Sequence, residues 1–290
     1  MCPTSGAQAA QIPAQESPAQ PPPPTARVPQ TEPHPQTKNS LPSEGCCVHQ
    51  TLKLATINAR GLRSHLVDMQ TIMSTPQPPD ILVVTETKLK RQQKKQWLHR
   101  LFTSYTIKHT THPEASKAGV LLAVSKTLTE LGELKMHTSP TELNGFVIHA
   151  SLVQPNSTPM HLVAVYCPHQ LPIRKEIYTY VSQLVTDARA DKEQLLIAGD
   201  FNAFMQKEDR ASGNNKSADT LHKEFITVNG LTPLDTPLQG TARSFTYRKG
   251  VEQTPFSRLD DILTLQPLLH THTETISMAG TNLDHDVLVA

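Results

Sequence analysis

Beyond residue 50 the chain alternates short apolar runs with segments whose apolar residues recur at helical spacing. Continuous or alternating apolar runs predict β-strands, whereas apolar residues at every third or fourth position predict helices. The expected strands span residues 52–58, 80–86, 105–109, 119–125, 145–153, 161–167, 194–200, 244–248, 259–265, 271–277 and 287–290. Helices are expected over residues 66–73 and 173–190, with a further helix after residue 86.

The lengths of the connections between these strands constrain the fold. Neighbouring strands within residues 105–125 and 145–167 are joined by segments too short for a crossover helix, so antiparallel pairing must be common. Helices of sufficient length to cover a sheet face are also expected. The predicted fold is therefore an α/β sandwich of two packed, mixed, largely antiparallel sheets with helices outside.

The first 50 residues have a different composition. Residues 21–24 are all proline, further prolines surround them, and branched apolar residues are rare. Such a segment buries too little surface to offset the entropy of ordering it. We expect residues 1–50 to be a disordered Pro-rich tail and residues 51–290 to form one domain.

Composition narrows the functional class only slightly. No secretory signal and no apolar run long enough to cross a bilayer is visible, so we expect an intracellular protein without a membrane partner. A net charge of +1 argues against nucleic-acid binding by bulk charge. It leaves room for a local basic patch, and one follows residue 86, with members Lys88, Lys90, Arg91, Lys94 and Lys95.

Polar residues of reactive types stand at the ends of six predicted strands. They are Asn58, Glu86, Tyr166, the pair Asp200 and Asn202, Asp260, and the pair Asp284 and His285. If these ends converge at one edge of the two sheets, carboxylates and amides surround a single imidazole. Oxygen ligands with little sulfur or histidine suit a hard cation, above all Mg²⁺, for which Mn²⁺ is a possible substitute.

The pattern indicates hydrolytic chemistry on a phosphoester. A hard cation together with substrate phosphate oxygens supports such hydrolysis. A carboxylate beside an imidazole fixes its tautomer and stabilises its charged form, which is the role expected for Asp260 beside His285.

In this order, the motifs resemble those of the endonuclease/exonuclease/phosphatase superfamily. They are Asn58, TETK at 85–88, YCPH at 166–169, GDFN at 199–202, SRLD at 257–260 and DH at 284–285. That superfamily includes deoxyribonuclease I, AP endonucleases, inositol polyphosphate 5-phosphatases and neutral sphingomyelinases, all four-layered α/β sandwiches. The resemblance covers essentially all of residues 51–290.

Within the superfamily the chain most resembles the endonuclease domain of non-LTR (LINE-type) retrotransposons. The matching stretches are INARGL at 57–62, PDILVVTETKL at 79–89, SKAGVLLAVS at 116–125 and GDFNAFMQKEDR at 199–210. The tryptophan-rich strand and the Cys-Asp-Arg sequence of the 5-phosphatase branch are both missing from the sequence. AP endonucleases are the nearer competitor.

The resemblance implies a role for each matching residue. Glu86, helped by Asn58 and Asp284, would hold the divalent ion. Asp200 would activate or orient the attacking water, and Asn202 would bind the phosphate and help to position Asp200. The remaining three residues would act on the substrate phosphate, with Tyr166 contacting it and His285, oriented by Asp260, stabilising the developing negative charge.

These roles imply an in-line displacement on DNA that leaves a 3′-hydroxyl and a 5′-phosphate. In a retrotransposon that 3′-hydroxyl primes reverse transcription at the target site, which would place the protein in the nucleus. The basic run beside Glu86, above all Lys88, Lys90 and Arg91, would then position DNA through its phosphates.

Two positions depart from the superfamily pattern. His169 stands where Asn usually follows the Tyr-x-Pro motif, and Leu283 stands where Ser usually precedes Asp-His. His169 would contact phosphate through a different donor. Leu283 removes a hydroxyl near the Asp284 loop. Neither change deletes a predicted metal ligand, so we expect activity, reduced in extent by these departures.

Three other functions remain open from the sequence. The chain could be an AP-site repair endonuclease, a phosphatase of the same superfamily, or a degenerate module that binds without cleaving. The sequence stops at Ala290 with no reverse transcriptase. It is therefore expected to be either a fragment of a longer element or a free-standing remnant. Neither its oligomeric state nor its target sequence follows from these residues.

Overall fold

The computed structural model describes residues 51–90, 96–114, 117–211, 216–234, 244–249, 254–265, 273–278, 281 and 283–290. All of them belong to one compact unit, Gln50–Ala290. The tail expected over residues 1–50 lies outside the described residues.

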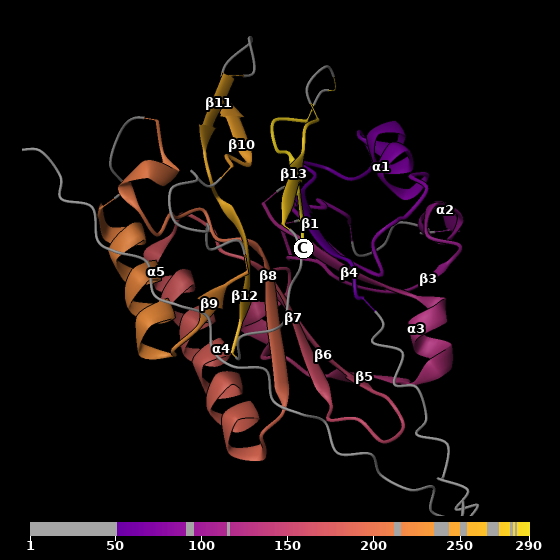
Figure 1. The fold of residues 1–290 in the computed structure, drawn as a ribbon. Helices are drawn as coiled ribbons and strands as arrows, with labels where there is room; N and C mark the ends of the chain where they lie inside the picture. The colour runs from indigo at the N-terminus through magenta and orange to yellow at the C-terminus, as the bar shows by residue number, and fades with distance from the viewer. Residues whose placement is uncertain are drawn as a thin grey trace, which may run out of the picture. The chain divides into compact units, whose positions relative to one another are not determined.

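Two six-stranded sheets form the centre of this unit (Figure 1). The first has the order β13-β14-β1-β2-β4-β3, made by Glu274–Ile276, Val287–Val289, Leu54–Asn58, Ile81–Thr85, Val120–Ser125 and Tyr105–Thr110. The second has the order β5-β6-β7-β8-β12-β9, made by Glu133–His137, Val147–Val153, Met160–Tyr166, Gln194–Asp200, Asp260–Thr264 and Thr232–Pro233. A ribbon of β10 (Tyr247–Lys249) and β11 (Thr254–Ser257) extends beyond them.

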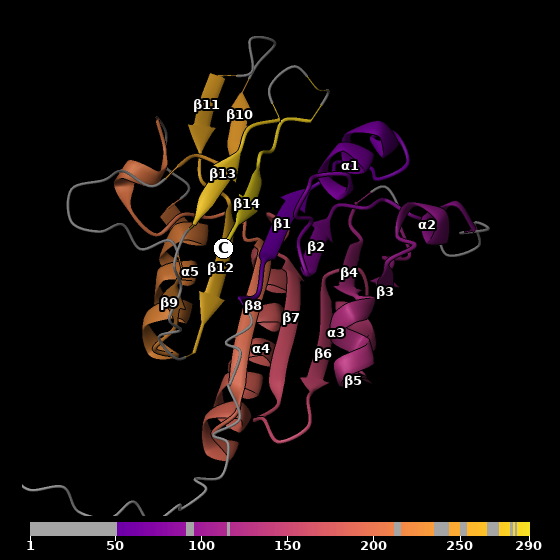
Figure 2. The same ribbon diagram turned by 45° about the vertical axis from the view of Figure 1, so that its right-hand side comes forward.

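Helices cover the outer faces of both sheets (Figures 1 and 2). The helices α1 (Leu66–Met73) and α2 (Gln96–Leu101) pack on the first sheet through Met69 and Leu98. The long helix α4 (Leu171–Asp191) packs on the second sheet, beside α5 (Lys216–Val228). Shorter segments are α3 (Lys126–Leu131), η1 (Thr141–Leu143) and η2 (Lys207–Asp209). This four-layered arrangement confirms the α/β sandwich expected from the sequence.

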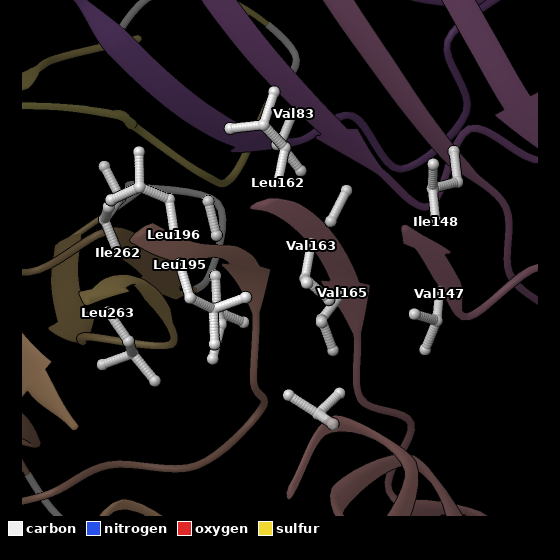
Figure 3. Close-up of a cluster of buried hydrophobic side chains, with 14 of the residues drawn as sticks. Val83, Val147, Ile148, Leu162, Val163, Val165, Leu195, Leu196, Ile262 and Leu263 are labelled. Carbon is white, nitrogen blue, oxygen red and sulfur yellow. The ribbon is translucent and has the colours of Figure 1, made fainter. Parts of the chain in front are cut away.

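The core has a layer between the sheets and a layer under each set of helices. Because side chains alternate along a strand, neighbouring residues of the second sheet serve different layers. Figure 3 shows Ile148, Leu162 and Ile262 on the side of this sheet that faces Val83 of the first sheet. Val147, Val163 and Leu263 lie on the opposite side, which α4 covers, and all of these side chains are buried.

Strand register brings the reactive strand ends to one edge. β1 pairs parallel with β2, and β7 pairs parallel with β8, with Tyr166 opposite Asp200. β12 runs antiparallel to β8, so its first residue, Asp260, also lies opposite Asp200. The carboxyl ends of four strands and the amino end of β12 therefore coincide.

Gly199 permits the close approach of β7 and β8 at this edge. Its φ is +150°, and a Cβ atom there would lie 1.8 Å from the carbonyl oxygen of Val165. The glycine is required because any side chain would force the two strands apart just before Asp200.

The strands and helices expected from the sequence appear with boundaries shifted by a few residues. Helix 66–73 and strand 194–200 match residue for residue. The segments not expected are α3, β5, β9, β11 and α5. β5 was missed because it is an edge strand whose side chains are mostly exposed, and its apolar alternation is limited to Leu134 and Met136, too few positions to predict a strand.

Candidate active site

The two sheets bring the predicted site residues together at one edge. Asn58 ends β1 and Glu86 immediately follows β2 in the first sheet. Tyr166 and Asp200 end β7 and β8 in the second sheet, and Asp260 begins β12. Of these residues Asn58, Tyr166, Asp200 and Asp260 are buried, whereas the Glu86 side chain keeps 18% of its surface exposed.

Asn58 joins the carboxylates of the two sheets. Its Nδ2 donates hydrogen bonds to Glu86 Oε1 at 3.1 Å and to Asp200 Oδ2 at 2.7 Å. Tyr166 Oη donates to the same Glu86 oxygen at 3.0 Å. The resemblance implied that Asn58 would help Glu86 to hold a metal ion, for which only its amide oxygen is a suitable ligand atom. In the structure that oxygen accepts from the backbone N–H of Arg60, and the amide nitrogen faces the carboxylates.

Asn202 fixes the Asp200 carboxylate from the other side. Its backbone N–H donates to Asp200 Oδ1 at 2.8 Å, and its Nδ2 donates to Asp200 Oδ2 at 3.2 Å and to the carbonyl of Cys167 at 3.0 Å. Both Asp200 oxygens therefore accept hydrogen bonds from Asn202.

Asp260 and His285 form a buried pair next to Asp200. His285 Nδ1 lies 2.7 Å from Asp260 Oδ2. One carboxylate oxygen each of Asp200 and Asp260 and one ring nitrogen of His285 all lie within 4.8 Å of one another. The carboxylate fixes the ring so that Nε2 is the nitrogen left for a substrate. Tyr247 of β10, which the sequence analysis did not single out, lies against the ring with centroids 5.2 Å apart.

The environment shifts the pKa of Glu86 downward. Burial acts to raise it, but hydrogen bonds from Lys88 and Asn58 and the charge of Lys88 outweigh burial and hold the pKa of Glu86 below its usual range. The Lys88 ammonium lies 2.8 Å from Glu86 Oε2. Glu86 is therefore ionised over the physiological pH range, as a ligand for a cation must be.

The pKa values of the more deeply buried groups Asp200, His285 and Tyr166 are raised. Burial, together with the nearby charge of Asp260, raises the pKa of Asp200 to about 7. Burial opposes the charging of His285, but Asp260 and Asp200 outweigh it and raise the pKa of His285 to about 9. Burial and the charge of Glu86 also raise the pKa of Tyr166. The phenol and the imidazolium are thus both hydrogen-bond donors near neutral pH, beside a carboxylate suited to proton transfer.

Asp284 is joined to this group through Arg60. The Arg60 guanidinium lies 2.5 Å from Asp284 Oδ2, and the Arg60 backbone is bonded to Asn58 as described above. Asp284 Oδ1 and Asp260 Oδ1 are buried and have no hydrogen-bond partner. Unpartnered buried carboxylate oxygens such as these are ligands of the kind that a hard divalent cation takes.

The backbone is strained at several of these positions. Arg60, Glu86, Lys88 and Asn202 all have φ between +45° and +52°, the left-handed region that non-glycine residues rarely adopt. Only two other described non-glycine residues, Asn156 and Lys192, have positive φ. The concentration of such residues at one edge is typical of functional sites, where surrounding contacts hold costly backbone conformations in place.

The expected substrate-binding residues are only partly within the described chain. Lys88 forms the ion pair with Glu86, Lys90 is exposed, and Arg91 lies outside the described residues, as do Lys94 and Lys95. His169 is exposed three residues beyond Tyr166. The structure thus supplies two accessible side chains, Lys90 and His169, near the strand ends, and their contact with phosphate stays a prediction.

Arg174 is a residue of the site that the sequence analysis missed. It is fully buried in the first turns of α4, and its guanidinium donates to the carbonyls of Phe201 at 2.5 Å, Pro168 at 3.0 Å and Asn202 at 3.3 Å. These carbonyls belong to the two segments that follow β7 and β8. A signal was present in the sequence, because Arg174 lies on the same helical stripe as the apolar residues Tyr178, Val181 and Val185.

Thr281 stabilises the loop that precedes Asp284, where the family serine is replaced by Leu283. The Thr281 hydroxyl donates to the carbonyl of Met278 at 2.7 Å and accepts from the backbone N–H of Leu283 at 3.1 Å. Leu283 itself is fully buried in the core under α1 and α2. The hydroxyl at position 281 and the apolar anchor at 283 together set the loop.

We expect Thr281→Val to lower the free energy of unfolding by about 1–2 kcal/mol, because valine keeps the shape but leaves the backbone N–H of Leu283 without its acceptor and removes one of the two donors to the Met278 carbonyl. Urea denaturation measures the change. Thr186→Val is the matched control, since this exposed hydroxyl donates to the Ser182 carbonyl of its own helix, and its loss should cost less than about 0.5 kcal/mol. Equal values for the two variants would contradict the role given to Thr281.

The fold and the site define a class of protein: a four-layered α/β sandwich with a hydrolytic arrangement of acid, amide and imidazole groups at one edge. Residues 55–276 match the sequence model of the Endonuclease/Exonuclease/phosphatase family, so the chain belongs to that family. Members of this family are metal-dependent phosphodiesterases and nucleases. A comparison with curated proteins found no match.

Solved structures share the fold at low sequence identity. An AP endonuclease from Leishmania major superposes with a TM-score of 0.70 and 18% identity over 82% of this chain and 86% of that one. A 3′ phosphatase from Neisseria, bound to a product DNA hairpin, superposes with a TM-score of 0.65 and 16% identity over 82% of this chain and 98% of that one. For an AP endonuclease from Archaeoglobus fulgidus the TM-score is 0.62 and the identity 21%, over 82% of this chain and 98% of that one.

The helices that the structure describes include none with both the length and the apolar character needed to span a bilayer.

Proposed function

We propose that this chain is a magnesium-dependent DNA endonuclease of the type found in non-LTR retrotransposons, which nicks one strand and leaves a 3′-hydroxyl and a 5′-phosphate. One observation supports it above others: parallel strand pairs in both sheets end at one point. There Asn58 bonds both Glu86 and Asp200, next to the Asp260–His285 pair. Such convergence is needed for water activation and phosphate binding at a single centre.

Each residue has a task in this proposal. Asp200 takes the proton of the attacking water, and its orientation is maintained by Asn58 and Asn202. The Asp260-oriented imidazole of His285 and the phenol of Tyr166 donate to phosphate oxygens as negative charge develops. A magnesium ion bound by Glu86 and Asp284, with Asn58 as a further ligand after rotation of its amide, would neutralise charge on the phosphate. Mn²⁺ would fit the same oxygen ligands.

The choice of DNA as substrate has two supports. The solved structures that share this fold include AP endonucleases and a phosphatase bound to a DNA hairpin. Positive side chains at Lys88, Lys90 and Arg91 directly follow Glu86 in the sequence, where they would contact phosphates without reading bases.

The retrotransposon role is supported by the sequence stretches around Asn58, Glu86 and Asp200 that resemble that branch. In this role the 3′-hydroxyl left by the nick would prime a reverse transcriptase, and the protein would act in the nucleus. AP-site repair is a second candidate, favoured by the two AP endonucleases that superpose on this fold.

Nicking of supercoiled plasmid in magnesium is the first test, with EDTA as the metal-free arm and the Asp200→Asn variant, purified in parallel, as the control for contaminating nuclease. The ends of the nick are then identified. A DNA polymerase extends a 3′-hydroxyl, and a kinase labels the 5′ end only after phosphatase treatment. Matched duplexes with and without one abasic site are cut in the same buffer.

Magnesium-dependent nicking of the intact duplex with extendable 3′ ends would support the proposal. Cleavage confined to the abasic duplex would favour repair instead. A folded protein that cuts neither duplex but releases phosphate from a 3′-phosphorylated oligonucleotide would assign it to the phosphatases, and a protein without any of these activities would be a non-catalytic module.

A further inference from the structure

Three histidines form a second cluster on the sheet that supplies Asp200. His137 ends β5, His149 is central in β6, and His161 is the second residue of β7. One ring nitrogen of each can be chosen so that all three lie within 4.8 Å of one another. Tyr166 is five residues further along β7, or about 16 Å at the usual rise per strand residue. The cluster is therefore separate from the candidate active site.

Strand register explains why residues twelve positions apart in the sequence meet. β5, β6 and β7 are neighbours in antiparallel pairing, with His137 directly opposite His149. His161 lies opposite Ser151, which makes it a diagonal neighbour of His149. His149 shares its face with Val147, and His161 shares its face with Val163, and Figure 3 shows both valines on the same side of the sheet.

The contacts within the cluster already orient two of the rings. His149 Nε2 lies 2.8 Å from His161 Nδ1, and His161 Nε2 lies 2.5 Å from Glu193 Oε2. A carboxylate accepts, so His161 donates through Nε2 and keeps the lone pair of Nδ1 directed at His149. A carboxylate behind a histidine that presents its other nitrogen inward is the usual arrangement around protein-bound zinc.

We propose that His137, His149 and His161 bind a zinc-type transition-metal ion, with Glu193 as the positioning residue for His161. Imidazole nitrogens suit Zn²⁺ and its neighbours in the first transition row, whereas Mg²⁺ prefers oxygen ligands. This site is additional to the proposed endonuclease function and does not depend on it.

The geometry requires a small separation of two rings and a larger movement of the accessible His137 side chain. Tetrahedral zinc with Zn–N bonds of about 2.0–2.1 Å places ligand nitrogens about 3.3 Å apart. The His149 and His161 nitrogens face one another at close to that spacing, so they separate slightly to admit the ion. The ring of His137 stacks on that of His149 with centroids 4.2 Å apart and must turn out of the stack. His137 is exposed, so it can turn if its Nε2 gives up the 2.9 Å contact with Ser151 Oγ, and the fourth position opens to water.

The protonation state of the cluster is compatible with metal binding. Burial, followed by the charges of its two neighbours, lowers the pKa of His149 to about 3, and burial lowers the pKa of His137. Neutral rings are the form that ligates metals, so protons compete little with the ion near neutral pH.

Cobalt substitution tests the site on the full chain. Excess Mg²⁺ is added first to occupy oxygen-ligand sites, and Co²⁺ is then titrated while visible absorption is followed. Zn²⁺ is added last as competitor, and melting temperature is measured with and without Zn²⁺. The variants are His137→Gln, chosen because the side chain is exposed and its loss should not disturb folding, and Glu193→Gln. His99→Gln, an exposed histidine on α2, is the matched control.

We expect one equivalent of Co²⁺ to give the visible bands of a nitrogen-ligated, low-coordinate ion and Zn²⁺ to abolish them. Zn²⁺ at about 100 times its Kd should raise the melting temperature by roughly 5–10 °C. Glu193→Gln should weaken the Zn²⁺ affinity about 10–100-fold. His137→Gln should remove the bands and the thermal shift without altering the melting temperature of the metal-free protein, and His99→Gln should change none of these.

Two results would overturn the proposal: wild-type protein that shows neither bands nor a thermal shift with these ions, or a folded His137→Gln variant that retains both at wild-type affinity. The second result would assign the bound metal to other residues of the chain.

Discussion

The substitution Asp200→Asn is expected to slow plasmid nicking by about 10²–10⁴-fold, the range that a positioned general base contributes. Asparagine has the shape of aspartate but cannot take a proton from the attacking water. It also places an amide nitrogen where Asp200 Oδ2 now accepts from Asn58 at 2.7 Å and from Asn202 at 3.2 Å. The loss should appear in kcat, because DNA is bound by other groups.

Initial nicking rates over a range of plasmid concentrations separate kcat from KM. Asp187→Asn is the matched control, because it makes the same chemical change at an exposed position on α4 and should leave the rate within about twofold. Circular dichroism verifies that both variants are folded. A folded Asp200→Asn protein with a wild-type rate would exclude the role assigned to this carboxylate.

The second large effect is expected for Arg174→Met, which should lower both the free energy of unfolding and the nicking activity. Arg174→Met keeps much of the side-chain length but leaves the carbonyls of Pro168, Phe201 and Asn202 buried without their donor. Removing one member of a buried charged network costs about 3–5 kcal/mol of unfolding free energy. Because these carbonyls fix the segments after β7 and β8, nicking should fall even at temperatures where the variant remains folded.

Guanidinium chloride denaturation gives the unfolding free energy, and nicking below the melting transition gives the activity of the folded fraction. Lys175→Met removes a positive charge from the neighbouring, exposed position of the same helix and should change either quantity little. If Arg174→Met behaved like Lys175→Met, the guanidinium would not be what fixes the two segments.

The sequence was sufficient to predict the strand ends of the site because the strands that lead to them are mostly apolar. Residues 81–85 and 54–58 are buried throughout, and such runs are clear even without periodic alternation. The convergence of Asn58, Glu86 and Asp200 then follows from parallel pairing. The actual hydrogen bonds do not follow, and neither does the orientation of the Asn58 amide, whose nitrogen faces Glu86 while its oxygen accepts from the backbone of Arg60.

Two features could not be predicted from the sequence: a side-chain cluster that depends on strand register, and a charged residue that is buried. The cluster of His137, His149 and His161 exists only because β5 and β7 both pair with β6 in a particular register, and single strands do not encode that register. Arg174 was missed because a charged residue at the start of a helix is most often solvated, and here it is fully buried.

The pairing of β14 with β1 has a consequence for synthesis of the protein. β1 is among the first segments of the domain to be translated, yet its antiparallel neighbour, Val287–Val289, is made more than two hundred residues later, together with Asp284 and His285. On the ribosome β1 must therefore wait for its partner, and pairing over such a separation is slow. A nascent chain stalled before this segment would lack the imidazole of the site. The group of Asn58, Glu86, Asp200 and His285 is thus complete only after translation of the domain has passed β14.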